Sequence, residues 1–453
     1  MKDIPDFLPF PSDFHFGTAV SAFQVEGNTG TRKSDWDEFL QKHPDIVSAK
    51  EIGPQWWEKG NAEEDIDAMA KLGMQTQRLS FEWARIEPEE GKYNTQALER
   101  YREIIDYLHA KNIQPLVTLN HYSLPDWIAK RGSWENPYIV NAFVRYVGEV
   151  AKAFPDVKTW LTINEPAVLV ESGYLLPFFP PQRNGIFSAI RAHHYLLSAH
   201  KKAYKILKRE IPESMVSMAF SFRWYRPENP KDLLERLYAF AVNYLDSLNY
   251  VDGVKDYIDF IGVNYYAGYY LNFNPSKMRL RIHGPESHSL KTIFFGEVKK
   301  PGAYVSDLGS PIVPGFFLEL LQTLNKRYHK PIIITENGIA DKKDTHRSFY
   351  LLVHVVSIWK AIQQGIDVRG YCVWATVDNL EWLEGYKEEF GLLHVDAVTG
   401  KRTLRKSAML YSDIVTKRGI DVQRLLSTYF TNEQKEKARE LIYHLFTHHG
   451  TML

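Results

Sequence analysis

The fold is decided by segments such as Thr159-Trp160-Leu161-Thr162-Ile163-Asn164-Glu165-Pro166. A run of β-branched and apolar residues predicts a buried strand, and the proline that follows cannot continue a ladder of backbone hydrogen bonds. The segment Ile334-Thr335-Glu336-Asn337-Gly338 has the same form, with glycine in place of proline as the stop. Each segment therefore predicts a strand that ends at a glutamate.

Outward from these two segments, short apolar runs alternate with longer runs of helical periodicity, such as Asn61–Leu72. The candidate strands are Phe16–Ser21, Gln75–Phe81, Gln114–Asn120, Thr159–Asn164, Val216–Ser221, Asp259–Asn264, Pro331–Glu336 and Gly370–Ala375. This alternation predicts the α/β class, as a single (β/α)8 TIM barrel with extended loops over its C-terminal mouth. An open, doubly wound sheet is the alternative, but no glycine-rich phosphate loop follows any of these strands.

The domain organisation follows from the absence of any Ser/Gly-rich linker before residue 419. We expect one barrel domain over residues 1–419 and a C-terminal helical extension over residues 420–453. Within the extension, Asn432–Phe446 has apolar residues at helical spacing and predicts a helix packed on the outside or on a partner subunit. Residues 272–313, which are polar and contain several prolines and glycines, are expected to pass over the barrel mouth.

Charge and cysteine usage exclude several classes of function. The chain has 55 Lys and Arg against 55 Asp and Glu, so no basic excess favours nucleic acid or an anionic membrane. Its single cysteine, Cys372, allows neither an internal disulfide nor a cysteine zinc site. The first residues do not resemble a signal peptide and no apolar run is long enough to span a bilayer, so we expect a cytoplasmic protein.

Glu165 and Glu336 are the strongest functional candidates. Residues at the C-terminal ends of barrel strands face the mouth, where active sites lie, so strands four and seven would present these glutamates to each other. Paired carboxylates perform glycoside hydrolysis. A separation of about 5–5.5 Å permits a covalent intermediate with retention, and about 6.5–9.5 Å gives inversion. A lone glutamate at a strand end is more often a solvated side chain, but two in these contexts favour a catalytic pair.

With these motifs in order, the chain resembles glycoside hydrolase family 1 from about Phe10 to Thr416. The resemblance implies that Glu165 in Asn-Glu-Pro is the general acid/base and that Glu336 in Thr-Glu-Asn-Gly is the nucleophile. It implies a retaining exo-β-glycosidase that removes terminal β-D-glucosyl, galactosyl or fucosyl residues through a covalent glycosyl–enzyme. Small β-glycosides or β-linked oligosaccharides would be its substrates, and the barrel would be its catalytic domain.

The resemblance also implies the residues that surround the sugar. Substrate contacts are expected from Gln24, His121, Asn164, Tyr266, Trp374, Glu381 and Trp382. Arg78, at the end of the second strand, can place a cation beside Glu336 and keep the nucleophile ionised. Each of these residues could instead have a structural role, as a turn cap, a core aromatic or an internal salt bridge. Glu82 and Glu87 are assigned as solvated or salt-bridged side chains.

Several positions bear on specificity. A carboxylate at Glu381 suits neutral sugar hydroxyls and would repel the phosphate of a 6-phosphoglycoside. Tyr122-Ser123 stands where the family frequently has Trp-Asp, and Glu389-Phe390-Gly391 where it frequently has Arg-Phe-Gly. The segments Arg78–Arg85 and Glu336–Asp341 are more similar to the archaeal, heat-stable branch.

Other functions remain open at this point. A catalytically silent sugar-binding relative would usually lack one glutamate, and both are present here. An enzyme that mainly transfers glycosyl groups to acceptors other than water would have the same residues. The two-carboxylate mechanism requires no metal or cofactor, and the histidines lack HExxH spacing. A homo-oligomer is possible.

Overall fold

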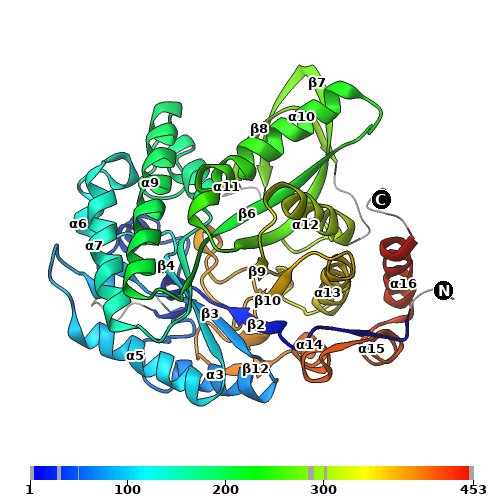
Figure 1. The fold of residues 1–453 in the computed structure, drawn as a ribbon, viewed down its shortest axis with the longest axis horizontal. Helices are drawn as coiled ribbons and strands as arrows, with labels where there is room; N and C mark the ends of the chain where they lie inside the picture. Colours follow the sequence, from blue (N-terminus) through cyan, green and yellow to red (C-terminus); the bar gives the residue numbers. More distant parts are fainter. Residues whose placement is uncertain (1–4, 28–31, 49, 284–289, 300–303, 448–453) are drawn as a thin grey trace.

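A closed barrel of parallel strands forms the centre of the computed structural model, which describes residues 5–27, 32–48, 50–283, 290–299 and 304–447. The ring runs β2-β3-β4-β5-β6-β7-β9-β10 and closes from β10 onto β2 (Figure 1). Its strands are β2 (His15–Ala19), β3 (Thr76–Ser80), β4 (Gln114–Asn120), β5 (Thr159–Asn164), β6 (Met215–Pro227), β7 (Ile261–His283), β9 (Ile332–Asn337) and β10 (Val368–Trp374). The predicted (β/α)8 barrel is confirmed.

Helices lie outside the barrel and connect successive strands (Figure 1). The longer connecting helices are α3 (Asn61–Lys71), α5 (Thr95–Ala110), α7 (Tyr138–Ala153), α9 (Ile186–Glu210), α10 (Leu233–Asn243), α12 (Pro314–Tyr328), α13 (Arg347–Gln363) and α14 (Lys406–Lys417). Short helices in the loops are α1 (Ala22–Val25), α2 (Asp35–Lys42), α4 (Trp83–Ile86), α6 (Asp126–Ala129), α8 (Pro166–Val170) and α11 (Asn249–Val254). The loops also hold 3₁₀ turns at Ser133–Glu135, Lys255–Tyr257 and Trp382–Glu384, and π-helical turns at Glu171–Leu175 and Tyr244–Leu248.

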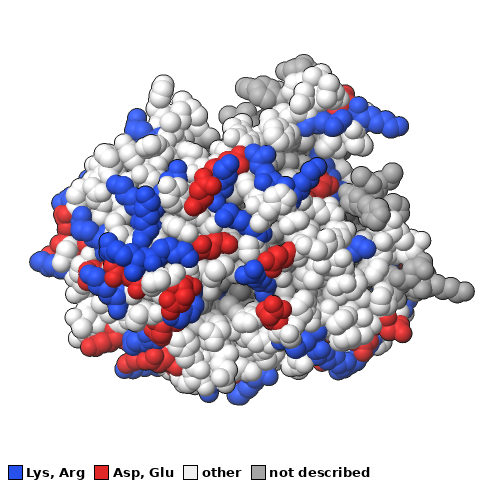
Figure 2. Space-filling model, in the orientation of Figure 1, with Lys and Arg blue, Asp and Glu red and all other residues white. Residues whose placement is uncertain are grey.

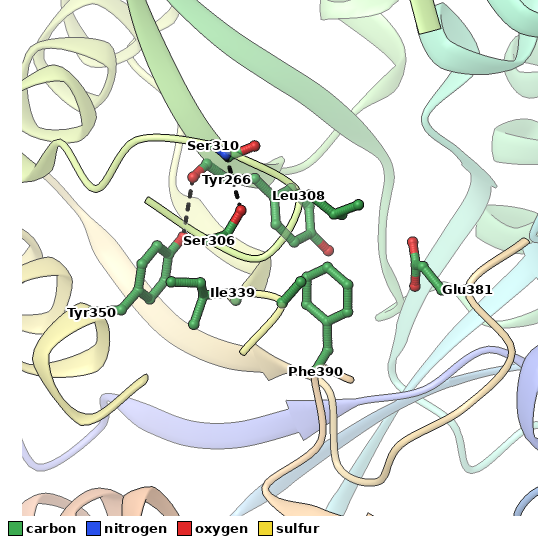
Figure 3. A pocket seen from close by; sticks show the side chains of 10 residues that line it. Tyr266, Ser306, Leu308, Ser310, Ile339, Tyr350, Glu381 and Phe390 are labelled. Atoms are coloured by element: carbon green, nitrogen blue, oxygen red, sulfur yellow. Dashed lines mark hydrogen bonds between the residues drawn. The ribbon is translucent and has the colours of Figure 1, made fainter. Parts of the chain in front are cut away.

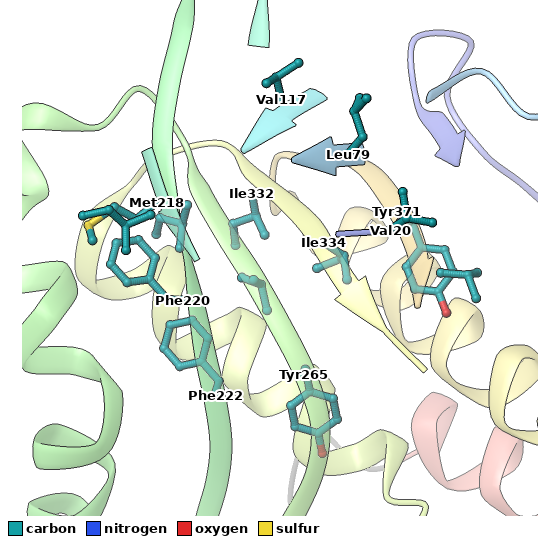
Figure 4. Packing of buried hydrophobic residues seen from close by; sticks show 14 of the residues in the cluster. Val20, Leu79, Val117, Met218, Phe220, Phe222, Tyr265, Ile332, Ile334 and Tyr371 are labelled. Carbon is teal, nitrogen blue, oxygen red and sulfur yellow. The ribbon is translucent and has the colours of Figure 1, made fainter. Parts of the chain in front are cut away.

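Strands such as β4 and β9 carry apolar residues on both faces because both faces are buried. Side chains such as Leu79, Val117 and Ile334 belong to a core cluster shared with the helices (Figure 4). A separate cluster of Leu116, Leu161, Ala219 and Phe260 comes from the same strands and the residue before β7. Alternate side chains thus fill two cores, which fixes the strands and the positions of the residues that end them.

The segment between the sixth and seventh strands differs in part from expectation. β7 continues well past the barrel and pairs antiparallel with β8 (Leu290–Lys299), from Tyr270↔Lys299 to His283↔Leu290. Figure 1 shows this ribbon projecting away from the barrel beside α10. Residues 284–289 and 300–303 lie outside the described residues. The following residues do reach the mouth, since Ser306, Leu308 and Ser310 line a pocket there.

The C-terminal segment packs beside the chain's beginning. β1 (Phe7–Pro9) pairs antiparallel with β13 (Gly419–Asp421), and α15 (Val422–Tyr429) follows directly. The predicted terminal helix is α16 (Asn432–Thr447), and the ring of its Phe446 stacks on Trp359 of α13 at 5.5 Å. A further small ladder joins β11 (Leu393–Val395) to β12 (Arg402–Leu404).

The surface carries both signs of charge, and Lys and Arg lie among Asp and Glu on the face that Figure 2 shows. Among the described residues, none of the helices combines the length and the apolar character that a bilayer crossing requires.

Candidate active site

Glu336 lies near the end of β9 and is buried, with 4% of its surface exposed. One carboxylate oxygen, Oε1, is ion-paired with Nη1 of Arg78 from β3. The other, Oε2, accepts a hydrogen bond of 2.5 Å from the hydroxyl of Tyr266 in β7. Arg78 has no exposed surface and also donates to Thr118 Oγ1 at 3.2 Å. A fixed cation and a phenol therefore hold the Glu336 carboxylate from two sides.

Glu165 follows β5 in a left-handed conformation, with φ 41° and ψ 62°, directly before Pro166. Proline disfavours the right-handed helical conformation in the residue before it, and this helps the strand end abruptly here. The carboxyl oxygen Oε2 accepts from the hydroxyl of Tyr122, and Oε1 accepts from Nδ2 of Asn264 at 2.9 Å. Both partners of Glu165 are neutral, in contrast to the cation at Glu336.

Asn164 links the two glutamates into one hydrogen-bond network. Its Oδ1 accepts from Nη2 of Arg78 at 2.6 Å and from Nδ2 of Asn264 at 3.2 Å. Arg78 also contacts Glu336, and Asn264 also contacts Glu165. The predicted pair thus meets at one place in the barrel mouth, joined through shared partners.

Opposing effects act on the pKa of Glu336. Burial raises the pKa of Glu336 to about 7, and the nearby Glu165 carboxyl acts in the same direction. Arg78 and the hydrogen bond from Tyr266 lower the pKa of Glu336. Arg78 therefore favours the ionised form of Glu336, but its effect on the pKa of Glu336 does not outweigh that of burial. The guanidinium of Arg78 pairs with Glu336, so the cation acts on the Glu336 carboxyl more directly than on Glu165.

His121 is held as a neutral imidazole. Burial, and secondly the charge of Arg78, lower the pKa of His121 well below its ordinary value. Because Asn164 Oδ1 takes two donors, its Nδ2 is the donor to His121 Nε2 at 3.1 Å. The hydrogen of the imidazole is therefore on Nδ1, which is buried and has no hydrogen-bond partner among the described residues. This free donor is suited to a ligand oxygen.

Aromatic rings line the site beside His121. Its ring lies nearly parallel to those of Trp374 and Trp382, at 6.0 Å from each. Trp382 also stacks on Phe23 at 5.7 Å and lies 4.6 Å from Trp36. Trp374 ends β10, and Trp382 lies in the loop that follows, so the structure brings both predicted tryptophans to the mouth.

Gln24, in α1, already has hydrogen-bond partners within the protein, so it is not a freely available ligand for a sugar. Its Nε2 donates to Asn379 Oδ1 at 3.0 Å and to the carbonyl of Leu380 at 2.7 Å. Its Oε1 accepts from Ser21 Oγ at 2.6 Å. One lone pair on Oε1 is left, so Gln24 can still accept from a hydroxyl while it fixes the loop after β10.

Glu381 reaches a cavity of about 170 Å³ beside Tyr266 (Figure 3). The remaining lining comes from Ser306, Leu308, Ser310, Gly338, Ile339, Ala340, Tyr350 and Phe390. Glu381 Oε2 is buried, and none of the residues that the structure describes forms a hydrogen bond with it. Burial, with the nearby carboxyls of Glu336 and Glu165, raises the pKa of Glu381 to about 8. The group can therefore donate as well as accept near neutral pH.

Sequence reasoning missed Tyr122 and Asn264 as partners of Glu165. Their positions at the ends of β4 and within β7 beside Tyr266 were the available signal, because strand ends face the mouth. Of the two alternatives for Glu82 and Glu87, a solvated or a salt-bridged side chain, the first is wrong, since they are 2% and 0% exposed. Glu82 accepts from Ser123 Oγ at 2.7 Å, and burial raises the pKa of Glu82 to about 7.

Possible metal ligands lie away from the glutamate pair. Among the described residues, the groups with suitable spacing are Asp106, His109 and Asp156, and Asp378, Glu389 and His394. In the second group, the guanidinium of Arg405 already contacts Asp378 and Glu389. That cluster is therefore an ion-pair network that ties the Glu389 segment to α14.

Comparisons with known proteins agree with this geometry. The family model described as "Glycosyl hydrolase family 1" matches residues 8–244 and 244–420. "Beta-glucosidase A" of Thermotoga maritima is 32% identical over 457 residues, covering 91% of this chain and 99% of that protein. A solved β-glycosidase from Pyrococcus horikoshii matches with a TM-score of 0.82 and 34% identity, over 94% of this chain and 100% of that one.

A β-glucosidase from Thermotoga maritima, solved in complex with glucoimidazole, matches with a TM-score of 0.80 and 30% identity, over 91% of this chain and 100% of that one. The family match and these relatives extend over nearly the whole barrel, including both glutamate motifs. The chain belongs to glycosyl hydrolase family 1 and is a glycoside hydrolase of the β-glycosidase type.

Proposed function

We propose that the protein is a retaining exo-β-glycosidase that removes the terminal β-D-glucosyl residue, and also β-galactosyl and β-fucosyl residues, from small glycosides. The observation that carries the proposal is the division of charge between the two glutamates. Arg78 pairs with Glu336, whereas the donors to Glu165 in the described part of the chain are Tyr122 and Asn264, which are both neutral. This arrangement favours an ionised nucleophile beside a protonated acid.

The mechanism follows from that division. Glu336 Oε attacks the anomeric carbon while Glu165 gives its proton to the glycosidic oxygen, so the aglycone leaves as a neutral alcohol and a glycosyl–enzyme ester forms. The ester removes the charge of Glu336, and Glu165 is then free to stay ionised. In the second step, Glu165 takes a proton from water as the water oxygen bonds the anomeric carbon and Glu336 departs. Both inversions together retain the configuration.

The glycone is proposed to contact Gln24, His121, Asn164, Tyr266, Trp374, Glu381 and Trp382. His121 Nδ1 offers a free donor and Glu381 Oε2 a free acceptor for hydroxyl groups. The acidic neighbours of Glu381, which include Glu388 and Glu384, would repel a phosphate, so unphosphorylated sugars are favoured. The activities named for the relatives support β-glucosides among the substrates.

The assignment is tested with 4-nitrophenyl β-glucoside and two variants. Glu336→Gly should lower kcat by at least about 10⁴-fold, since the nucleophile is lost. Glu165→Ala should spare substrates with good leaving groups. With azide as nucleophile, Glu165→Ala should give the β-glycosyl azide and Glu336→Gly the α-glycosyl azide. The exchanged result would reverse the two roles.

The stereochemistry is tested separately on the wild-type enzyme. Proton NMR during the first minutes of hydrolysis should show the β-anomer of the sugar before mutarotation. An initial α-anomer would contradict retention, and unchanged turnover by Glu336→Gly would contradict the whole assignment.

The mechanism also predicts independence from metals. We expect the same kcat/KM before and after dialysis against EDTA, because both carboxyls act without a metal ion. Loss of activity that returns with an added divalent cation would contradict this prediction.

We also propose that residues 1–419 form the catalytic domain and that residues 420–453 are a helical extension that stabilises it. The packing of α16 on α13 supports this division. Assembly into a homo-oligomer stays a prediction.

A further inference from the structure

Tyr122 lies two residues after β4 (Gln114–Asn120), at the barrel mouth. Its backbone has φ 72°, in the left-handed region that bulky residues seldom adopt. The side chain is 4% exposed, and its ring lies 5.0 Å from Trp382 and 5.6 Å from Phe179. The backbone and the packing together fix where the hydroxyl lies.

That hydroxyl donates to Glu165 Oε2, while Asn264 Nδ2 donates to Glu165 Oε1 at 2.9 Å. The two partners differ in what they can do. An amide NH₂ is only a donor, whereas a phenol can donate to a carboxylate or accept from a carboxylic acid. Burial, and next the charge of Glu165, hold the pKa of Tyr122 well above its ordinary value, so the phenol keeps its proton.

A hydrogen bond to the ionised form of a carboxyl is stronger than one to its neutral form. The Tyr122 contact therefore favours the carboxylate of Glu165 and lowers its tendency to hold a proton. Glycosylation needs the proton on Glu165, and deglycosylation needs it absent. A donor at this position thus acts in opposite directions on the two steps.

We propose that Tyr122 is a positioning residue that sets the balance between the acid and base forms of Glu165 and favours the base. This inference rests on the proposed role of Glu165. During glycosylation, the proton moves from Glu165 to the departing oxygen and the Tyr122 hydroxyl turns to donate to the new carboxylate. During deglycosylation, Glu165 accepts a proton from the attacking water while that hydrogen bond weakens.

The test compares Tyr122→Phe with the wild type. Phenylalanine keeps the ring that packs between Trp382 and Phe179, so the fold is expected to persist. On phenyl β-glucoside, a poor leaving group, the alkaline limb of kcat/KM should move upward by about one pH unit, because Glu165 holds its proton longer. On 2,4-dinitrophenyl β-glucoside, whose turnover is limited by deglycosylation, kcat at pH values below the alkaline limb should fall about tenfold, because a tenfold smaller fraction of Glu165 is ionised and able to act as base.

The matched control is Tyr411→Phe, which removes a fully buried hydroxyl that donates to the Gly17 carbonyl at 3.0 Å. The alkaline limb of its kcat/KM profile and its kcat on both substrates should equal those of the wild type. An unchanged or downward-shifted alkaline limb in Tyr122→Phe would overturn the inference, even if the Glu336 and Glu165 variants behave as expected. Failure of those two variants would instead overturn the function on which the inference rests.

Discussion

At the scale of single residues, the site depends on which partners each carboxyl has. Glu336 receives a guanidinium and a phenol, and Glu165 receives a phenol and an amide. Both carboxyls have a phenol as partner, so the guanidinium of Arg78 at Glu336 is the charged group that distinguishes their surroundings. A change at Arg78 should therefore appear in the acidic side of the pH profile.

We predict that Arg78→Met moves the acidic limb of kcat/KM upward by about 1–3 pH units, because a cation within a few ångströms lowers a carboxyl pKa by that amount. The wild-type limb should lie near pH 7, since burial raises the pKa of Glu336 to about 7. Activity requires ionised Glu336, so a higher pKa shifts the onset of activity to higher pH. Arg78→Lys keeps the charge and should move the limb less; an equal shift in both variants would contradict the argument.

At the scale of strands and loops, the site depends on how closely β9 and β10 approach at their ends. Gly338 follows β9, and a Cβ added there would lie 1.9 Å from the carbonyl oxygen of Trp374. Only glycine allows this approach, which holds Glu336 and Trp374 on neighbouring strand ends. A side chain here would part the two strands without touching either functional group.

We predict that Gly338→Ala destabilises the fold by about 1–3 kcal/mol through overpacking. It should also lower kcat/KM by about 10²-fold, because a displacement near 1 Å misaligns the reacting groups. Thermal melting and initial rates measure both effects. Gly315→Ala is the control, since a Cβ there meets nothing within 4 Å, and both quantities should stay close to wild type. A Gly338→Ala enzyme with the stability and the kcat/KM of the wild type would contradict this prediction.

At the scale of the whole molecule, the barrel assembles the site, whereas the C-terminal helix contributes to stability. The residues around Glu165 and Glu336 come from β3, β4, β5, β7, β9 and β10, so closure of the barrel is needed to assemble them. α16 instead packs on the outer helix α13, with Ala438, Ile442 and Leu445 buried. Weakening the packing of α16 should therefore lower the stability of the fold without lowering the activity.

We predict that Ile442→Ala lowers the free energy of unfolding by about 2–5 kcal/mol, which is typical for a buried isoleucine, and lowers the Tm by several degrees. The kcat/KM at 25 °C should not change, because α16 lies outside the barrel. Tyr443→Ala, next to it and 40% exposed, is the control and should leave the Tm nearly unchanged. A large loss of kcat/KM in folded Ile442→Ala enzyme would contradict this prediction, because it would show that α16 contributes to activity.

The barrel and the placement of Glu165 and Glu336 at its mouth could be predicted from the sequence because both depend on local signals. Periodicity and β-branched runs give the strands, and Glu165-Pro166 and Glu336-Asn337-Gly338 mark where two of them stop. Strand ends in a barrel share one face, so the meeting of the glutamates follows from the topology. The length of β7 and its pairing with β8 could not be predicted from the sequence, because antiparallel pairing depends on a distant partner strand.

The sequence by itself thus determined the barrel, the family and the two glutamates, since these depend on short-range pattern and order along the chain. Only the tertiary structure decided that Tyr122 and Asn264 hold Glu165, that Gln24 is anchored by Leu380, and that Glu82 is buried. Hydrogen-bond partners, burial and proton affinity depend on distances between residues far apart in sequence. Those distances exist only once the closed barrel has brought its strand ends together.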